Sequence, residues 1–460
     1  MDRHFIDVMK SNHTIAAIAT GPGPAALAMI RISGPDSARI GDAIFSGKVR
    51  PSDMESHLLH YGHIIDAGGA RLDEVILAVL RPPHSFTAEQ MVEITCHGGG
   101  AAAGAVLEAA LAAGARPARP GEFSLRAFLN GRIDLAQAEA VCDIINARTG
   151  TAARAALERL SGGLSRKIAA VRESLLDAAA LVESLIDFPE EDIPPAESGK
   201  LINDIDRARE QIARVLAGSK AAMVLKDGAR VVIAGRPNVG KSSLFNMLLK
   251  EEKAIVTETP GTTRDVLEGW IDIGGIPVRL FDTAGLRDTL DEIESHGMER
   301  ARGKLEQADL VLLVLDGTGP MDQEDEKLLS QTEKYARLIL VNKCDLSQSL
   351  VNGTGGSWLK ISAVTEEGLP ELESSIVARL TDGQGIEPGA ASAANARQAQ
   401  LMGECLKHLE VARNGLQQKL SYDLLASDLK AAIDALGQIT GQTIGDDILD
   451  RIFEKFCIGK

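Results

Sequence analysis

The feature that most constrains this chain is a glycine-rich loop at residues 235–242, with the sequence Gly-Arg-Pro-Asn-Val-Gly-Lys-Ser. Residues 231–234 before it are apolar and mostly β-branched, which predicts a buried parallel strand, and residues 243–249 after it carry apolar side chains at helical spacing. In this context the backbone N–H groups of the loop can point at phosphate oxygens, Lys241 adds a cation and Ser242 can ligate Mg²⁺. The sequence therefore predicts a nucleotide site.

Length and composition are those of a globular protein with several domains. A chain of 460 residues is too long for one core and suggests about three domains, and 45% apolar with 25% charged residues is ordinary for such a protein. The longest apolar run, Leu310–Leu315, has the length of a buried strand, so no membrane association is expected. Five cysteines without a CxxC pair, and an N-terminus unlike a signal or transit peptide, predict a cytoplasmic protein without disulfides or structural zinc.

The net charge of −16 argues against broad binding to nucleic acid, which depends on neutralising phosphates with lysine and arginine. Any contact with RNA is therefore expected to be local. One arginine-rich stretch, Arg116, Arg119, Arg126 and Arg132, could supply it, and a solvated surface is the equal alternative.

The order of sequence patterns predicts a multidomain α/β protein. Residues 1–120 alternate short apolar runs with glycine and proline breaks, which is typical of an α+β domain. Helical stripes of apolar residues follow, one from Leu157 to Val182 and another that includes Leu420 and Leu424. Because domain termini often lie close together, we infer a helical domain into which the nucleotide-binding domain is inserted. The predicted bounds are 1–120 for the N-terminal domain, 121–222 and 382–460 for the all-α domain, and 223–381 for the inserted domain with its mostly parallel sheet.

Three further stretches fit a guanine-nucleotide site, and each follows a short apolar strand pattern. They are Asp282-Thr283-Ala284-Gly285, Asn342-Lys343-Cys344-Asp345 and Ser362-Ala363. The first can serve the metal and the γ-phosphate. In the second, a carboxylate can accept two N–H bonds from the guanine edge, and adenine would leave that charge unpaired. The glycine-rich loop and these three stretches, in this order, resemble the motifs of the GTPase superfamily of translation factors and Ras-like proteins.

The residue after Gly285 departs from many GTPases, which carry a glutamine there to orient the attacking water. Leu286 can neither donate nor accept a hydrogen bond, so another group must position the water. The acidic run of Asp288, Asp291, Glu292 and Glu294 lies just downstream. Upstream, Thr263 could complete the Mg²⁺ shell, and Arg264 is a weaker candidate for an arginine finger.

With these residues in place, the chain resembles the MnmE (TrmE) family of tRNA-modifying GTPases from end to end. The matching segments outside the nucleotide motifs are Arg31-Ile-Ser-Gly34, His97-Gly-Gly99, Arg119-Pro-Gly-Glu-Phe123, Asp134-Leu-Ala-Gln-Ala-Glu139 and Cys457-Ile-Gly-Lys460.

The resemblance implies an N-terminal domain that binds tetrahydrofolate and forms a homodimer, a central helical domain and an inserted Ras-like GTPase domain. It implies K⁺-dependent GTP hydrolysis that drives carboxymethylaminomethyl-type modification at C5 of the wobble uridine (position 34) of certain tRNAs. The implied partner is the FAD-dependent MnmG (GidA) protein, in a heterotetrameric or larger complex, and the implied one-carbon carrier is 5,10-methylene- or 5-formyl-tetrahydrofolate.

The resemblance also implies roles for individual residues in the GTPase domain. Asn238 matches the P-loop K⁺ ligand, Thr257, Thr259 and Thr262 match the potassium loop, and Glu294 matches the glutamate that positions the water. K⁺ would then take the place of an arginine finger, and Leu286 becomes an expected residue. The implied nucleotide contacts are Asn238, Val239, Gly240, Lys241, Ser242, Ser243, Thr257, Glu258, Thr259, Pro260, Gly261, Thr262, Thr263, Asp282, Thr283, Ala284, Gly285, Asn342, Lys343, Asp345, Ser362 and Ala363.

For folate, the implied residues are Arg31, Glu93, Arg132 and the C-terminal Lys460, with Arg132 standing where some members carry lysine. From the residues alone, Arg31 could equally form a structural ion pair. Cys457 matches a cysteine that the family requires for modification, and its flanking lysines would favour an accessible thiolate.

Two other functions remain open at this point. A GTPase that acts only as a binding switch, for example in ribosome assembly, would give the C-terminal cysteine no role. A regulatory dimer could hold folate as a structural ligand only.

Overall fold

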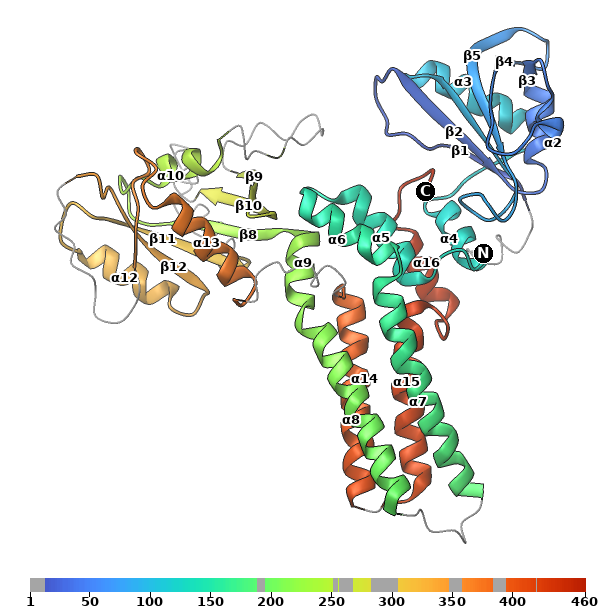
Figure 1. Cartoon of the computed structure of the whole chain (residues 1–460). Helices are drawn as coiled ribbons and strands as arrows, with labels where there is room; N and C mark the ends of the chain where they lie inside the picture. The colour runs from blue at the N-terminus through green and yellow to red at the C-terminus, as the bar shows by residue number, and fades with distance from the viewer. Residues whose placement is uncertain are drawn as a thin grey trace. The chain divides into compact units, whose positions relative to one another are not determined.

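The computed structural model describes residues 13–187, 195–250, 255, 268–282, 305–346, 358–383, 394–418 and 420–460. The chain divides into two compact units (Figure 1). The first unit combines residues 1–142 with the C-terminal residues 437–460, and the second unit contains residues 143–436.

The first unit is built on a seven-stranded sheet with the order β3-β4-β5-β6-β2-β1-β7. Its strands are β1 (Ile15–Ile18), β2 (Leu27–Ser33), β3 (Phe45–Gly47), β4 (Leu59–Ile65), β5 (Arg71–Leu80), β6 (Met91–His97) and β7 (Arg116–Pro117). Neighbouring strands are antiparallel except β1 and β7, which pair in parallel. Val75, Leu77 and Val79 of β5 are at most 2% exposed, because alternate side chains of a strand point to the same face of the sheet.

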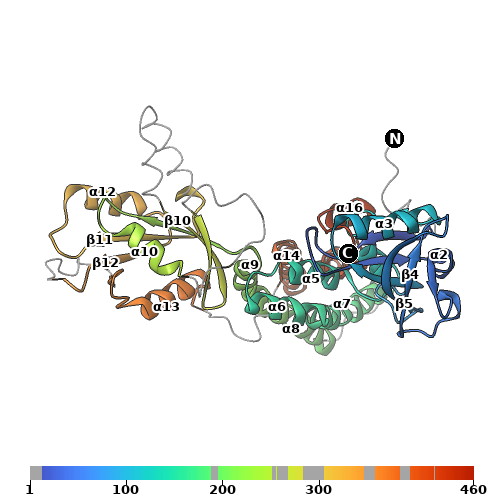
Figure 2. The same ribbon diagram turned by 90° about the horizontal axis from the view of Figure 1, so that it is seen from above.

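Helices and the C-terminal segment complete the first unit. The helices α2 (Ser37–Ile44) and α3 (Gly100–Ala112) pack against the sheet, with the one-turn helix η1 (Pro51–Asp53) beside α2 (Figure 2). A second core joins α4 (Glu122–Leu129) to α16 (Asp446–Phe453), where Leu125 and Phe453 are fully buried. The end of the chain is therefore part of the same unit as its N-terminal sheet.

The second unit contains a six-stranded sheet with the order β13-β12-β11-β8-β10-β9. Its strands are β8 (Ala229–Ala234), β9 (Glu268–Ile273), β10 (Ile276–Asp282), β11 (Leu310–Asp316), β12 (Arg337–Asn342) and β13 (Leu359–Lys360). All pairs are parallel except β9 with β10. Helices α10 (Lys241–Leu248) and α13 (Leu369–Leu380) contribute to one core against this sheet and α12 (Gln323–Thr332) to another, so the strands β8 and β11 are buried on both sides.

Long helices precede and follow this sheet in the chain. They are α5 (Leu135–Asn146), α6 (Gly150–Leu160), α7 (Gly163–Asp187), α8 (Pro195–Ala217), α9 (Ser219–Asp227), α14 (Ala396–Gln417) and α15 (Tyr422–Thr440). Helix α8 packs against α7 and α14, and Figure 1 shows α8 and α14 side by side. Because α8 and α9 precede the P-loop fold and α14 follows it, that fold is inserted into a helical region, and the predicted fold class is confirmed.

Two details of the predicted helical stripes are wrong. Leu157 is 55% exposed, because the chain turns at Gly162 (φ 80°) and the buried face of α7 begins anew at Leu164. Leu420 and Leu424 are also exposed, and the buried stripe of α15 instead begins with Leu425 and Leu429. The spacing of leucines continued across breaks in the helices, so periodicity alone placed the stripes incorrectly.

Candidate functional site

The P-loop lies between β8 and α10, as the sequence predicts. Gly240 has a φ of 96°, and a Cβ there would lie 2.2 Å from Nδ2 of Asn342, so only glycine fits this position. Lys241 is 7% exposed, and its Nζ donates a hydrogen bond to the carbonyl of Arg236, 2.7 Å away. The lysine ammonium is thus held against the loop, beside the positions that phosphate oxygens would take.

Ser242, predicted to ligate Mg²⁺, and Asp282, predicted for the second shell of that ion, lie close together beside the loop. Ser242 Oγ donates to Oδ2 of Asp282 across 3.0 Å, and Asp282 is 5% exposed at the end of β10. A hydroxyl and a carboxylate within one hydrogen bond of each other, next to the P-loop, are oxygen ligands of the type that Mg²⁺ prefers. The donor set therefore fits a magnesium ion.

The predicted guanine-binding stretches contact the P-loop directly. Asn342 is 2% exposed, and its amide donates to the Val239 carbonyl at 2.8 Å while its oxygen accepts the Ala363 N–H at 3.0 Å. Lys343 Nζ donates to the carbonyl of Asn238 at 2.9 Å. The structure therefore brings together the P-loop, residues 342–343 and Ala363, and the first and last of these are more than a hundred residues apart in the sequence.

The remaining nucleotide residues divide into two groups. Ser362 is buried and its hydroxyl accepts the N–H groups of Val364 and Thr365, while Asp345 and Ser243 are exposed to solvent. The other predicted positions lie outside the described residues: Thr257, Glu258, Thr259, Pro260, Gly261, Thr262, Thr263, Thr283, Ala284, Gly285 and Glu294, together with Arg264, Leu286 and the rest of the acidic run.

In the first unit, the residues predicted for folate gather at one place. Arg31 on β2 and Glu93 on β6 are cross-strand partners, and Arg31 Nε donates to Glu93 Oε1 at 2.8 Å. The guanidinium groups of Arg31 and Arg132 each lie about 5 Å from the ring centre of Phe86, at 5.0 and 5.1 Å. Among the described residues, nothing hydrogen-bonds the buried Nη1 of Arg31. A buried donor of this kind is suited to an anionic or carbonyl group of a ligand.

The C-terminal residues reach the same cluster. Burial lowers the pKa of Lys460, and the nearby Arg31 lowers it further, while Cys457 and Glu93 act in the opposite direction. The carbonyl of Cys457 accepts the N–H of Gly121 at 3.3 Å, whereas the Cys457 side chain is exposed. Arg31 and Glu93 of the sheet therefore interact electrostatically with the C-terminal Lys460.

Comparison with known proteins identifies the family. The family model for the MnmE helical domain matches residues 135–457, and the model described as the GTP-binding protein TrmE N-terminus matches residues 14–132. The tRNA modification GTPase MnmE of Chloroflexus aurantiacus is 46% identical over 98% of this chain and 100% of that protein. The chain belongs to the MnmE family of tRNA modification GTPases. It is accordingly a GTP hydrolase that takes part in tRNA modification, and it binds GTP through its P-loop domain.

The chain is also similar to two other proteins. The tRNA modification GTPase MnmE of Heliobacterium modesticaldum is 45% identical over 97% of this chain and 99% of that protein. Among solved structures, the G domain of the T. maritima FeoB iron transporter is 29% identical, with a TM-score of 0.24, and the match covers 33% of this chain and 98% of that domain. In the described part of this MnmE-family chain, no helix has the length and apolar character needed to cross a membrane.

One member of the arginine-rich stretch, Arg126, does not lie on the surface that the sequence suggested. Glu122 is fully buried and accepts hydrogen bonds from Arg116 and from Arg126, whose Nη2 lies 3.0 Å away. Arg126 is itself only 5% exposed and also pairs with Glu89 at 3.0 Å. Neither a solvated face nor an RNA contact describes Arg126, because its guanidinium is paired with Glu122 and Glu89 in the interior. Arg116 is 26% exposed and Arg132 is exposed, so these two arginines remain accessible to solvent.

The sequence reasoning missed two residues at these sites. The ring of Phe86 lies about 5 Å from the guanidinium groups of both Arg31 and Arg132, and Asp316 binds Lys343 beside the P-loop. Phe86 carries no motif signal, whereas Asp316 could have been noticed as the polar residue that ends the apolar strand β11.

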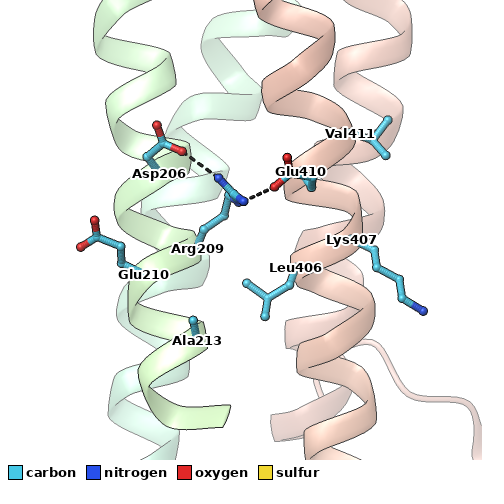
Figure 3. A pocket seen from close by; sticks show the side chains of 8 residues that line it. All are labelled: Asp206, Arg209, Glu210, Ala213, Leu406, Lys407, Glu410 and Val411. Carbon is cyan, nitrogen blue, oxygen red and sulfur yellow. Dashed lines mark hydrogen bonds and ion pairs between the residues drawn. The ribbon is translucent and has the colours of Figure 1, made fainter. Parts of the chain in front are cut away.

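A cavity of about 760 Å³ lies between α8 and α14 and is a groove between helices (Figure 3). Figure 3 shows Arg209 of α8 between Asp206 of the same helix, 3.0 Å away, and Glu410 of α14. Arg209, Asp206 and Glu410 thus pair with one another inside this groove.

Proposed function

We propose that this protein is a K⁺-dependent GTPase that, with an FAD-dependent partner, installs a carboxymethylaminomethyl-type group at C5 of the wobble uridine of certain tRNAs. The one-carbon unit would be carried by 5,10-methylene- or 5-formyl-tetrahydrofolate. The observation that carries this proposal is the cluster of Arg31, Glu93, Arg132 and Lys460, assembled from both ends of the chain.

The cluster has the donors and acceptors that a reduced folate would require. A pterin presents adjacent N–H donors on one edge, which a carboxylate such as Glu93 can accept, and the glutamate tail of folate is anionic, which suits arginine and lysine. Arg31 Nη1 is buried and without a hydrogen-bond partner in the described part of the chain, so a bound ligand would satisfy it. When bound, the folate would supply the one-carbon unit, and the residues of this chain would orient it.

Titration calorimetry of the full-length protein with 5-formyl-tetrahydrofolate tests this site. We expect Arg31→Met to weaken binding at least tenfold, because the loss of a hydrogen bond to a charged group costs about 1.5–3 kcal/mol. Arg39→Met is the matched control, because Arg39 is 61% exposed in an ion pair with Asp36 of the same unit. Equal binding by wild type and Arg31→Met would exclude the folate assignment and leave the GTPase assignment intact.

The K⁺ dependence concerns Asn238 in the P-loop. Its φ of 62° is unusual for a residue other than glycine, and its carbonyl is held by Lys343, so its side chain is presented from a fixed backbone. A monovalent cation next to the phosphates would neutralise developing charge, as an arginine finger does. Thr257, Thr259 and Thr262 are proposed to contribute further K⁺ ligands, with Ser242 and Thr263 on Mg²⁺.

GTP hydrolysis measured in K⁺ and in Na⁺ tests the cation assignment. We expect Asn238→Ala to abolish the difference between the two salts, and an unchanged preference for K⁺ would overturn it. A second variant tests the residue proposed to position the attacking water, Glu294. We expect Glu294→Ala to lower the kcat of GTP hydrolysis by at least tenfold.

Cys457 and the folate cluster would act in the tRNA chemistry. The cysteine side chain is exposed, and its backbone carbonyl accepts the N–H groups of Gly121 and Lys460, each at 3.3 Å. We expect Cys457→Ser to abolish wobble-uridine modification in a reconstituted system with the FAD-dependent partner, with GTP hydrolysis unchanged. Transfer of a labelled one-carbon group from folate to tRNA would distinguish a donor from a structural ligand.

The domain roles and the homodimer belong to the same proposal. Residues 1–120 would bind folate and dimerise, 121–222 and 382–460 would form the helical domain, and 223–381 would be the GTPase domain, in a cytoplasmic protein. Leu59, Tyr61 and Ile76 are 74%, 61% and 43% exposed, and Tyr61 and Ile76 are cross-strand neighbours on β4 and β5. Apolar side chains grouped on an exposed sheet face support a partner surface. Sedimentation of Tyr61→Arg should show monomer where the wild type shows dimer, and a dimeric variant would exclude this face.

A further inference from the structure

Asp316, at the carboxyl end of β11, belongs to none of the motifs that define the nucleotide site. Its Oδ2 lies 2.7 Å from Nζ of Lys343, and its Oδ1 accepts the N–H and the hydroxyl of Thr318 at 3.0 and 2.7 Å. Burial by itself would raise the pKa of Asp316, but the hydrogen bonds from Lys343 and Thr318 outweigh it and lower the pKa to about 2. The carboxylate is therefore ionised and directed at the lysine.

Lys343 passes this interaction to the P-loop. Its Nζ also donates to the carbonyl of Asn238 at 2.9 Å, so one ammonium joins Asp316 to the loop. Asn238 and Lys343 both adopt left-handed backbone conformations, with φ values of 62° and 68°. Residues other than glycine keep such conformations only where their surroundings hold them. The contacts of this ammonium supply part of that constraint.

We propose that Asp316 is a positioning residue for guanine-nucleotide binding, because it holds the Lys343 ammonium against the Asn238 carbonyl. The P-loop and the guanine-binding loop are thereby fixed relative to each other before the nucleotide arrives. Without the carboxylate, the Lys343 side chain, which is already 31% exposed, can turn into water. The nucleotide must then order both loops as it binds, which weakens affinity without changing the reacting groups.

The effect of Asp316→Asn on nucleotide affinity tests this role in the full-length protein. We expect the Kd for a fluorescent GDP analogue to rise roughly tenfold, the size of effect that follows from losing a hydrogen bond between charged groups. At saturating GTP, kcat should stay within about twofold, so the effect appears in KM. Asp382→Asn is the matched control, because Asp382 forms an exposed ion pair with Lys220 in the same unit and we expect wild-type affinity from it.

A double-mutant cycle with Lys343→Met decides whether Asp316 acts through the lysine. If it does, Asp316→Asn changes the Kd by less than about twofold in the Lys343→Met background. A tenfold effect in both backgrounds, or a wild-type Kd for Asp316→Asn alone, would overturn the proposal. The GDP-induced rise in Tm, measured for each variant against its own nucleotide-free form, reports binding separately from any loss of stability.

Discussion

The turn between β9 and β10 packs against the start of α6, and Gly275 lies at the centre of this contact. Thr149 caps α6 by accepting the Ala152 N–H at 3.1 Å, and its hydroxyl donates to the Gly275 carbonyl at 2.8 Å. Arg148 lies 4.1 Å from the ring centre of Trp270 on β9. Helix α6 is thus bound to the β9–β10 hairpin at the edge of the six-stranded sheet.

Replacing Gly275 with alanine should weaken this contact by an amount that the geometry sets. The φ of Gly275 is 89°, which costs an L-residue about 1–2 kcal/mol, and the new Cβ would lie 2.4 Å from Oγ1 of Thr151. Relieving such an overlap typically costs about 1–3 kcal/mol more. We therefore expect Gly275→Ala to lower the free energy of unfolding of this region by about 2–5 kcal/mol.

Urea unfolding followed by tryptophan emission measures the effect, because both tryptophans of the chain, Trp270 and Trp358, lie in the second unit. A loss of about 2 kcal/mol lowers the urea midpoint by roughly 0.7–2 M for an m-value of about 1–3 kcal/mol/M. Gly383→Ala is the matched control: its φ is 76°, and no heavy atom of the described residues lies within 4 Å of a Cβ there. Equal shifts for Gly275→Ala and Gly383→Ala would refute the role of the contact. Thr151→Ala should recover part of the loss in the Gly275→Ala protein.

Three more outcomes follow from the buried and exposed ionisable groups. Glu122→Gln should destabilise the first unit by about 3–5 kcal/mol, measured by hydrogen exchange of α4, because it removes the buried carboxylate that pairs with both Arg116 and Arg126. The pKa of Asp316 is about 2, below its usual 3.8, so the stability that its carboxylate contributes is present above about pH 4 and is lost as the pH falls toward 2. In urea titrations, wild type should be more stable than Asp316→Asn by about 2 kcal/mol at pH 6, and this difference should shrink between pH 4 and pH 2. At pH 8, a thiol reagent should modify the exposed Cys457 first and Cys405 last in mass-spectrometric time courses, because burial raises the pKa of Cys405 to about 12.

The nucleotide fold could be predicted from sequence because its signals are local. An apolar strand, a glycine loop and an apolar helix follow each other within about twenty residues at 229–248, and the structure has β8 and α10 there. The stripes of the long helices were predicted less well, since the spacing of Leu157 and Leu164 takes no account of the turn at Gly162 that separates α6 from α7.

The tertiary structure changed the interpretation of charged residues. From the sequence alone, the arginines from Arg116 to Arg126 are interpreted as a charged surface, because the sequence does not show that Glu122 is buried between them. Arg31 was open to two explanations, and the structure shows that it forms an ion pair with Glu93 while one of its donors remains without a partner among the described residues.

The sequence by itself determined the chemistry of the nucleotide site and the family, because those depend on residue types at short spacings along the chain. Only the tertiary structure decided which distant residues meet: Lys460 with Arg31, Thr149 with Gly275, and Asp316 with the lysine that holds the P-loop. Such meetings depend on how strands and helices pack, and packing involves burial and direction in space that no local pattern of residues contains.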